Sequence, residues 1–187
     1  MFSFMRQTAL LILLATLASL PVACGSSKQG DGLDGAAGAQ PTPVQRVFLN
    51  DRVFTVDDLK TAGMKVMNDY DVSGLEKAVS AYHLAFNKIE YEARLYLSHA
   101  DAVNVGQPWA DDISGDDGVV IGGNVKWQEG ASHRRLCSRA AETPHSGCSY
   151  SPRYGDYVIT GNLILLCEGV DTEHSMRACD DVLKNLK

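Results

Sequence analysis

Four cysteines in the second half of the chain are the residues best suited to covalent chemistry: Cys137, Cys148, Cys167 and Cys179. In an oxidising compartment an even number of cysteines predicts disulfides, here two. Local pairing would join Cys137 to Cys148 and Cys167 to Cys179 across short loops. Pairing of Cys137 with Cys179 and of Cys148 with Cys167 stays open, because spacing does not choose among the three connectivities.

A zinc site is the alternative use of these thiols. His133 precedes Cys137 and His174 precedes Cys179 at short spacing, and two thiolates with two imidazoles suit tetrahedral zinc. Exported thiols tend to oxidise, and this site would leave two cysteines over. We therefore expect disulfides and no metal or cofactor.

The acidic segment "DDISGDDG", residues 111–118, has some features of a calcium loop. When the loop is started at Asp112, Asp117 occupies the position that requires glycine, and Gly123 occupies the position of the bidentate glutamate. The segment is therefore expected to be a solvated acidic turn.

Acid–base chemistry would depend on a polar stripe of His83, Asn87, Glu90 and Arg94 on a predicted helix. An envelope enzyme, such as a hydrolase, could use His83 and Glu90. The chain has no G-x-S-x-G, H-E-x-x-H or phosphate-binding motif. The sequence thus predicts no catalytic residue, and a solvent-facing stripe is the preferred interpretation.

The segment "CSYSPRYGDY" is the candidate contact loop, with Tyr150, Arg153, Tyr154 and Tyr157. Tyrosine and arginine are frequent in binding hot spots. An exposed loop of this composition would suit a protein or glycan partner. The alternative is that its rings cover the edge of the core.

These side chains must be positioned by predicted helices. Residues 44–54 contain a short predicted strand, and Thr55 with Asp58 has the spacing of a capping box. Ser73 and Glu76 form a second box, which predicts a long amphipathic helix to about Val103. Its apolar stripe is Leu75, Val79, Tyr82, Phe86, Ile89, Ala93, Tyr96 and Ala100. A coiled-coil dimer is the alternative, but alanines and tyrosines make a poor seam.

The second half of the chain predicts β structure. "VVIGGNVKW" and "YVITGNLILLC" each place apolar runs around a turn, and they resemble two copies of one hairpin. Two hairpins can share a sheet and bury one face. The expected fold class is α+β, in which N-terminal helices, including the long one, pack on a small antiparallel sheet stapled by disulfides.

The N-terminus has a basic start, the apolar run "TALLILLATLASL" and a small residue, Ala23, before Cys24. This is the pattern of a secretory signal. "LPVAC" resembles the lipobox of bacterial lipoproteins, which implies cleavage after residue 23 and acylation of Cys24. A plain signal peptide that is cleaved near Ala23 is the alternative. Gly25 in place of aspartate implies the outer membrane by the same resemblance.

The chain is expected to have three parts. The lipoprotein resemblance implies a signal peptide of residues 1–23, and composition and length predict a Gly-rich disordered tether of 24–43 and one globular domain of 44–187. The acyl chains would attach the protein to a membrane. A formal net charge of -6 disfavours nucleic acid as a partner. We therefore expect a lipid-anchored envelope protein that serves as a binding or structural module.

Overall fold

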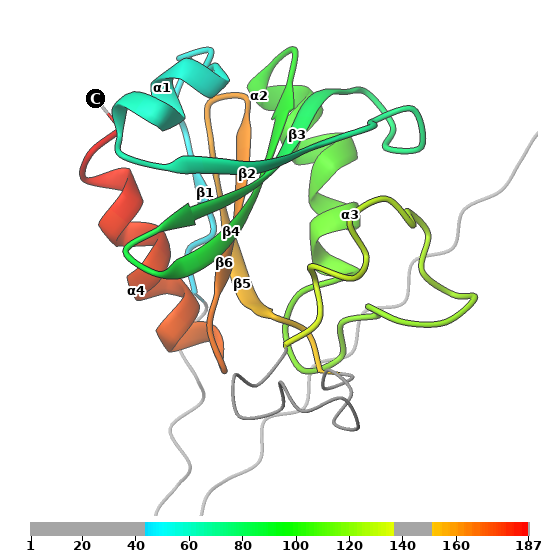
Figure 1. Cartoon of the computed structure of the whole chain (residues 1–187). Helices are drawn as coiled ribbons and strands as arrows, with labels where there is room; N and C mark the ends of the chain where they lie inside the picture. Colours follow the sequence, from blue (N-terminus) through cyan, green and yellow to red (C-terminus); the bar gives the residue numbers. More distant parts are fainter. Residues whose placement is uncertain (1–43, 137–150, 187) are drawn as a thin grey trace, which may run out of the picture. The chain divides into compact units, whose positions relative to one another are not determined.

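The computed structural model describes residues 44–136 and 151–186. Six strands form one sheet in the order β1-β5-β6-β4-β3-β2 (Figure 1). The strands are β1 Val47–Phe48, β2 Lys65–Tyr70, β3 Ala78–Phe86, β4 Ile89–Tyr96, β5 Tyr154–Thr160 and β6 Leu163–Glu168. β1 runs parallel to β5, and the other neighbouring strands are antiparallel. The sheet is therefore mixed.

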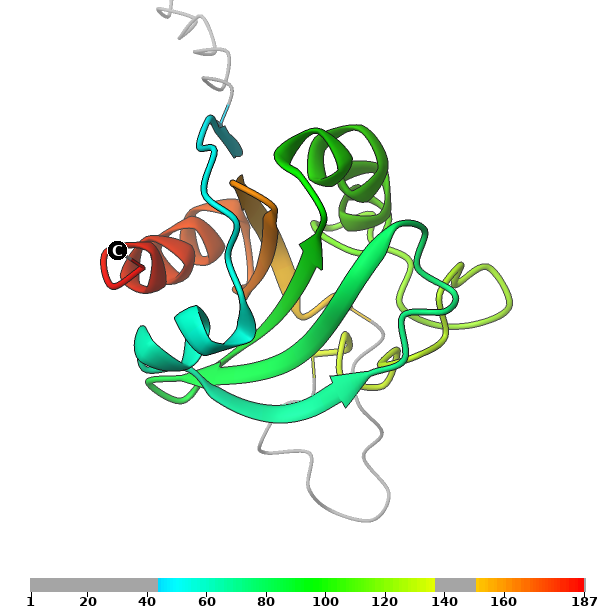
Figure 2. The ribbon, with the colours of Figure 1, turned by 90° about the horizontal axis from the view of Figure 1, so that it is seen from above.

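Short helices cover both faces of this sheet (Figures 1 and 2). They are α1 Val56–Thr61, α2 His99–Asp101, the π-helical turn η1 Ala102–Gly106, α3 Gln107–Asp111 and α4 Thr172–Leu183. α4 lies on one face, where Ala178 and Val182 join a buried cluster with Leu163 and Leu165. α2, η1 and α3 lie on the opposite face, together with the covering loop, by which we mean residues 113–136.

The expected α+β fold with a long N-terminal helix on a small antiparallel sheet is wrong. Residues 75–103 form mainly the β3–β4 hairpin, and Ser73 and Glu76 lie in a turn instead of capping a helix. The longest helix of the described chain is α4, with 12 residues. The protein is mostly sheet, with a few short helices around it.

The physical reason is that the sheet is covered on both faces. Six consecutive residues of β4, from Tyr91 to Tyr96, are buried, whereas a strand with one wet face would alternate. A segment that is apolar at most positions also has apolar residues at helical spacing, so periodicity alone does not distinguish a helix from a strand buried on both faces. The overlooked signal was Asn87-Lys88, where both residues have positive φ (50° and 68°), as a two-residue hairpin turn requires.

The first predicted hairpin, residues 119–127, is also wrong, because this segment forms turns within the covering loop. Its apolar side chains Val120, Val125 and Trp127 are buried all the same. They cover a face of the sheet without adding strands to it. The two similar segments are therefore not two copies of one structure.

Three local predictions are confirmed. The second hairpin exists as β5 and β6, and a short strand, β1, lies within residues 44–54. The capping box before α1 is complete: Thr55 Oγ1 accepts from the amide of Asp58, and Asp58 Oδ2 accepts from the amide of Thr55 at 2.8 Å.

A disulfide joins Cys167 of β6 to Cys179 of α4. Both residues are fully buried, so the bridge fastens α4 to the sheet from within the core. This bond excludes the pairing of Cys137 with Cys179. Cys137 and Cys148 lie outside the described residues, and their mutual pairing stays a prediction.

The predicted signal peptide, Cys24 and the tether also lie outside the described residues. Within residues 44–136 and 151–186, no helix has the length and apolar character needed to cross a membrane.

Candidate functional site

A buried carboxylate between two arginines is the centre of the candidate site. Glu92 and Arg94 lie two residues apart on β4, so both side chains point to the same face of the sheet. Arg134 reaches them from the covering loop. All three side chains are at most 1% exposed.

Each carboxylate oxygen of Glu92 binds one arginine. Arg94 Nε donates to Glu92 Oε1 at 2.7 Å, and Arg134 Nε donates to Glu92 Oε2 at the same distance. Arg134 also donates from Nη1 to the carbonyl of Trp127 (2.9 Å) and from Nη2 to that of Glu129 (2.7 Å). The second arginine therefore ties the backbone of the covering loop to the sheet.

Glu92 stays ionised in this environment. Burial alone would raise its pKa, but the charges and hydrogen bonds of Arg94 and Arg134 outweigh burial and lower it below its ordinary value. The ring of Trp127 adds a cation–π contact to both arginines, with its centroid 4.3 Å from Arg134 Cζ and 5.3 Å from Arg94 Cζ.

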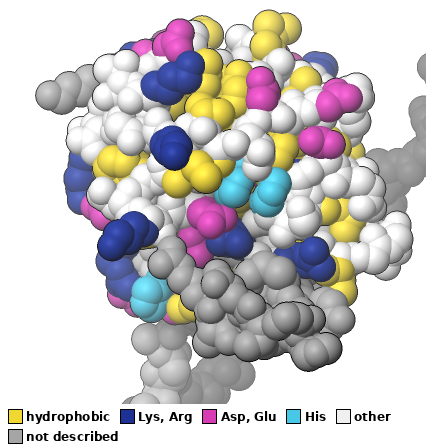
Figure 3. All heavy atoms as spheres, in the orientation of Figure 1, with side chains coloured by type: hydrophobic (Ala, Val, Ile, Leu, Met, Phe, Trp, Pro, Cys, Tyr) yellow, Lys and Arg dark blue, Asp and Glu magenta, His cyan; other side chains and the backbone are white. Residues whose placement is uncertain are grey.

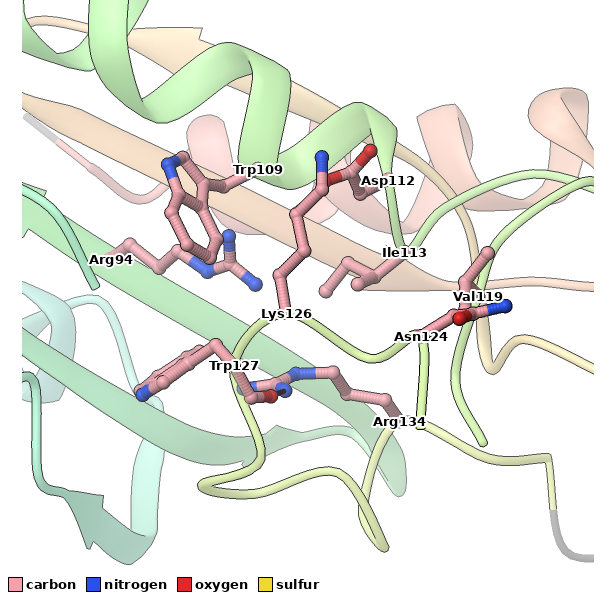
Figure 4. Close-up of a pocket in the computed structure, with 9 residues that line it drawn as sticks. All are labelled: Arg94, Trp109, Asp112, Ile113, Val119, Asn124, Lys126, Trp127 and Arg134. Carbon is pink, nitrogen blue, oxygen red and sulfur yellow. Dashed lines mark hydrogen bonds and ion pairs between the residues drawn. The ribbon is translucent and has the colours of Figure 1, made fainter. Parts of the chain in front are cut away.

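A cavity of about 70 Å³ lies beside Arg94, between α3 and the covering loop. Figure 4 shows Trp109 extending from α3 and Trp127 from the loop toward it. The lining residues are Arg94, Trp109, Asp112, Ile113, Val119, Asn124, Lys126, Trp127 and Arg134. Lys126 forms an ion pair with Asp112 at this cavity. The side chain of Lys126 is 59% exposed, so the cavity borders solvent.

One nitrogen of Arg94 is left over. Nε and Nη2 contact Glu92, but Nη1 is buried and has no hydrogen-bond partner among the residues that the structure describes. Burial raises the pKa of the neighbouring Tyr96 hydroxyl, and the charge of Arg94 and its side-chain contact with this hydroxyl oppose that shift. The contact does not have the distance and angle of a hydrogen bond, so the hydroxyl, like Nη1, has no hydrogen-bond partner in the described chain.

The ionic side chains around the cavity do not balance. Arg94, Arg134 and Lys126 carry three positive charges, and Glu92 and Asp112 carry two negative ones. Buried charges that lack a counterion are costly. The described residues therefore leave one positive charge that a small anion would neutralise.

A second polar cluster lies on the same face, around His83 and His133. Their rings stack with centroids 4.6 Å apart. His83 Nε2 contacts Glu90 Oε2 at 2.9 Å, and the Tyr70 hydroxyl contacts His133 Nδ1 at 2.8 Å. Histidine side chains gather beside acidic and basic ones in the middle of this view of the surface (Figure 3). Arg153 Nη1 completes the cluster, at 3.0 Å from Glu90.

The polar stripe that the sequence placed on a helix is thus divided. His83 and Glu90 do meet, but across the β3–β4 hairpin. Asn87 lies in the turn, and Arg94 belongs to the other site. His83 Nδ1 faces Asn68 at 3.4 Å, so both ring nitrogens of His83 have polar neighbours. This arrangement ties strands together and places no nucleophile beside a base.

The residues of the candidate contact loop are buried where the structure describes them. Tyr154 and Tyr157 are fully buried residues of β5, and Arg153 is 8% exposed. Their rings fill the face under α3, which was the alternative interpretation. Tyr150 lies outside the described residues.

The zinc and calcium interpretations are not supported either. Cys179 is oxidised in the disulfide and cannot be a thiolate ligand. Asp112 pairs with Lys126, and Ser114 Oγ donates to the carbonyl of Ala110 at the end of α3. No group of three or more metal-ligating side chains occurs in residues 44–136 and 151–186.

The sequence interpretation missed Glu92, Arg134, Trp109 and Trp127 as site residues. A usable signal was present in "IEYEARLYL", where charged residues interrupt a strand-like run of apolar ones. Charged residues in a buried strand need partners. The partner, Arg134, lies 42 residues further along the chain, and no local sequence pattern identifies it as the partner.

Comparison with known proteins gives one family. Residues 55–187 match a family described as one of unknown function, DUF6810. No curated protein and no solved structure matches the chain.

We predict that Glu92→Gln destabilises the protein by about 3–5 kcal/mol, because it leaves two buried guanidinium groups without a full counterion. Urea unfolding measures the change. Glu173→Gln is the matched control, since it removes an ion pair on the exposed face of α4, and it should leave the unfolding curve nearly unchanged. Equal effects of the two substitutions would contradict the role of Glu92.

We also predict that His133 makes the fold acid-sensitive. Burial, with the charges of His83 and Arg153, lowers its pKa below the ordinary 6.5. The unfolded chain therefore binds the proton more tightly, and stability falls as the pH falls below about 6.5. In His133→Gln this slope between pH 6.5 and 5 should be shallower, as measured by urea unfolding at each pH. Parallel curves for the two proteins would show that His133 does not contribute.

Proposed function

Because the chain belongs to the DUF6810 family, whose description states no function, we propose from its geometry that the domain is a binding module for a small anion. The observation that carries this proposal is Arg94, a buried cation whose side chain lines a cavity and whose Nη1 has no hydrogen-bond partner in the described chain. A buried donor without an acceptor destabilises the folded protein, because its lost hydration is not replaced. An anionic ligand would supply both the missing acceptor and the missing charge.

The cavity suits binding better than turnover. Glu92 is fixed between two arginines and stays ionised, so it has no proton to donate. Lys126 is held by Asp112. The side chains at this cavity therefore provide charge and apolar walls without a nucleophile that is activated by a base.

Binding can be followed by fluorescence, since both tryptophans of the protein, Trp109 and Trp127, line the cavity. We expect sodium propionate or sodium phosphate to change the emission saturably at one site per chain, and to be recovered unmodified after incubation. Lys126→Gln should weaken this binding. Lys77→Gln is the matched control, because Lys77 is a similarly exposed lysine paired with Asp101 away from the cavity. If neither salt saturates the signal, the proposed function fails.

We further propose that the module is a lipoprotein of the bacterial envelope, anchored through Cys24 and favouring the outer membrane. The support is the lipobox-like "LPVAC" after an apolar leader. A disulfide deep in the core is consistent with export, because such bonds persist in oxidising compartments.

Mass spectrometry of the protein from its native membrane, without reduction, tests the proposed lipid anchor and localisation. We expect a mature chain that begins at an acylated Cys24 and contains two disulfides, Cys167–Cys179 and Cys137–Cys148. The Cys167–Cys179 bond acts as the internal control for preserved oxidation, since it is present in the folded domain. A mature N-terminus without acyl chains would contradict the anchor.

A further inference from the structure

The cavity beside Arg94 has properties that select among anions, and this inference rests on the proposed function of anion binding. Four properties restrict which ligand can bind: the net charge of the site, the volume of the cavity, the unpaired nitrogen of Arg94 and the apolar walls. We infer that the cavity takes a small monocarboxylate, with its carboxylate between Arg94 and Lys126 and its hydrocarbon part against Trp109 and Trp127.

The charge balance favours a monoanion. Three lining residues are cationic, Arg94, Arg134 and Lys126, and one is anionic, Asp112. Together with the buried Glu92, which does not line the cavity but pairs with both arginines, they carry one excess positive charge. A carboxylate brings the total to zero. A phosphate dianion would leave one uncompensated negative charge beside the already buried Glu92, which is costly at low dielectric.

The available face of Arg94 also disfavours phosphate. Arginine binds phosphate best through a two-nitrogen fork, but Nε and Nη2 of Arg94 are already directed at Glu92. Nη1 alone has no hydrogen-bond partner in the described chain. One carboxylate oxygen can accept from Nη1 while the other faces the ammonium of Lys126, whose present partner is Asp112.

The walls and the volume exclude a bare inorganic ion as the best ligand. Trp109, Ile113, Val119 and Trp127 give the cavity apolar sides, which an inorganic ion cannot use but an alkyl group can. About 70 Å³ holds about five water-sized groups. A monocarboxylate with four to six heavy atoms, of which propionate is the simplest test case, is therefore the expected size.

The experiment compares the binding of four probes to the full-length protein by tryptophan fluorescence and calorimetry. The probes are sodium propionate, its neutral isostere propionamide, sodium phosphate and sodium chloride. We expect propionate to bind at least about tenfold more tightly than each of the other three, which corresponds to about 1.4 kcal/mol. In Lys126→Gln the propionate affinity should fall about tenfold, and in Lys77→Gln it should not change. Because Lys126 is exposed, its variant should remain folded.

The outcomes test the monocarboxylate inference separately from the proposed function of anion binding. Tighter binding of phosphate or chloride would overturn the monocarboxylate inference but leave the anion-binding function intact. Equal affinity for propionamide would show that charge is not recognised and would overturn both. If none of the probes gives a saturable signal, the cavity holds water only, and both the monocarboxylate inference and the anion-binding function are overturned.

Discussion

The ionised carboxylate of Glu92 is the interaction on which the rest of this face depends. A buried charge is tolerated only when it is paired and hydrogen-bonded, and Glu92 is satisfied from two directions. Arg94 comes from its own strand, and Arg134 comes from the covering loop. Because Arg134 also binds two loop carbonyls, neutralising one carboxylate fixes the position of a whole loop.

The same arrangement creates the cavity. Two arginines for one carboxylate leave an excess of positive charge, and Lys126 with Asp112 does not remove it. Trp109 and Trp127 keep the space partly apolar, and Trp127 adds cation–π stabilisation to both arginines. The unsatisfied Nη1 of Arg94 is thus a consequence of how the loop is attached.

The histidine cluster gives the covering loop a second attachment. His133 stacks on His83, and its carbonyl accepts from Arg153 Nε at 2.7 Å. On the opposite face the Cys167–Cys179 bond holds α4 against β6. The sheet is therefore fastened on one side by covalent chemistry and on the other by charge. The charged side is the one whose contribution to stability depends on pH, since protonation of His133 alters its electrostatics.

By itself, the sequence determined the features that depend on neighbours along the chain, the Thr55–Asp58 cap and the β5–β6 hairpin. It left the pairing of Cys167 with Cys179 open among three connectivities, and the packing of α4 on β6 decided it. Tertiary structure decided the rest. Whether residues 75–103 became helix or hairpin depended on a sheet covered on both faces, which removes the alternation that identifies a strand. The site depended on Glu92 meeting Arg134 from 42 residues away, and local spacing carries no information about which distant charge will neutralise a buried one.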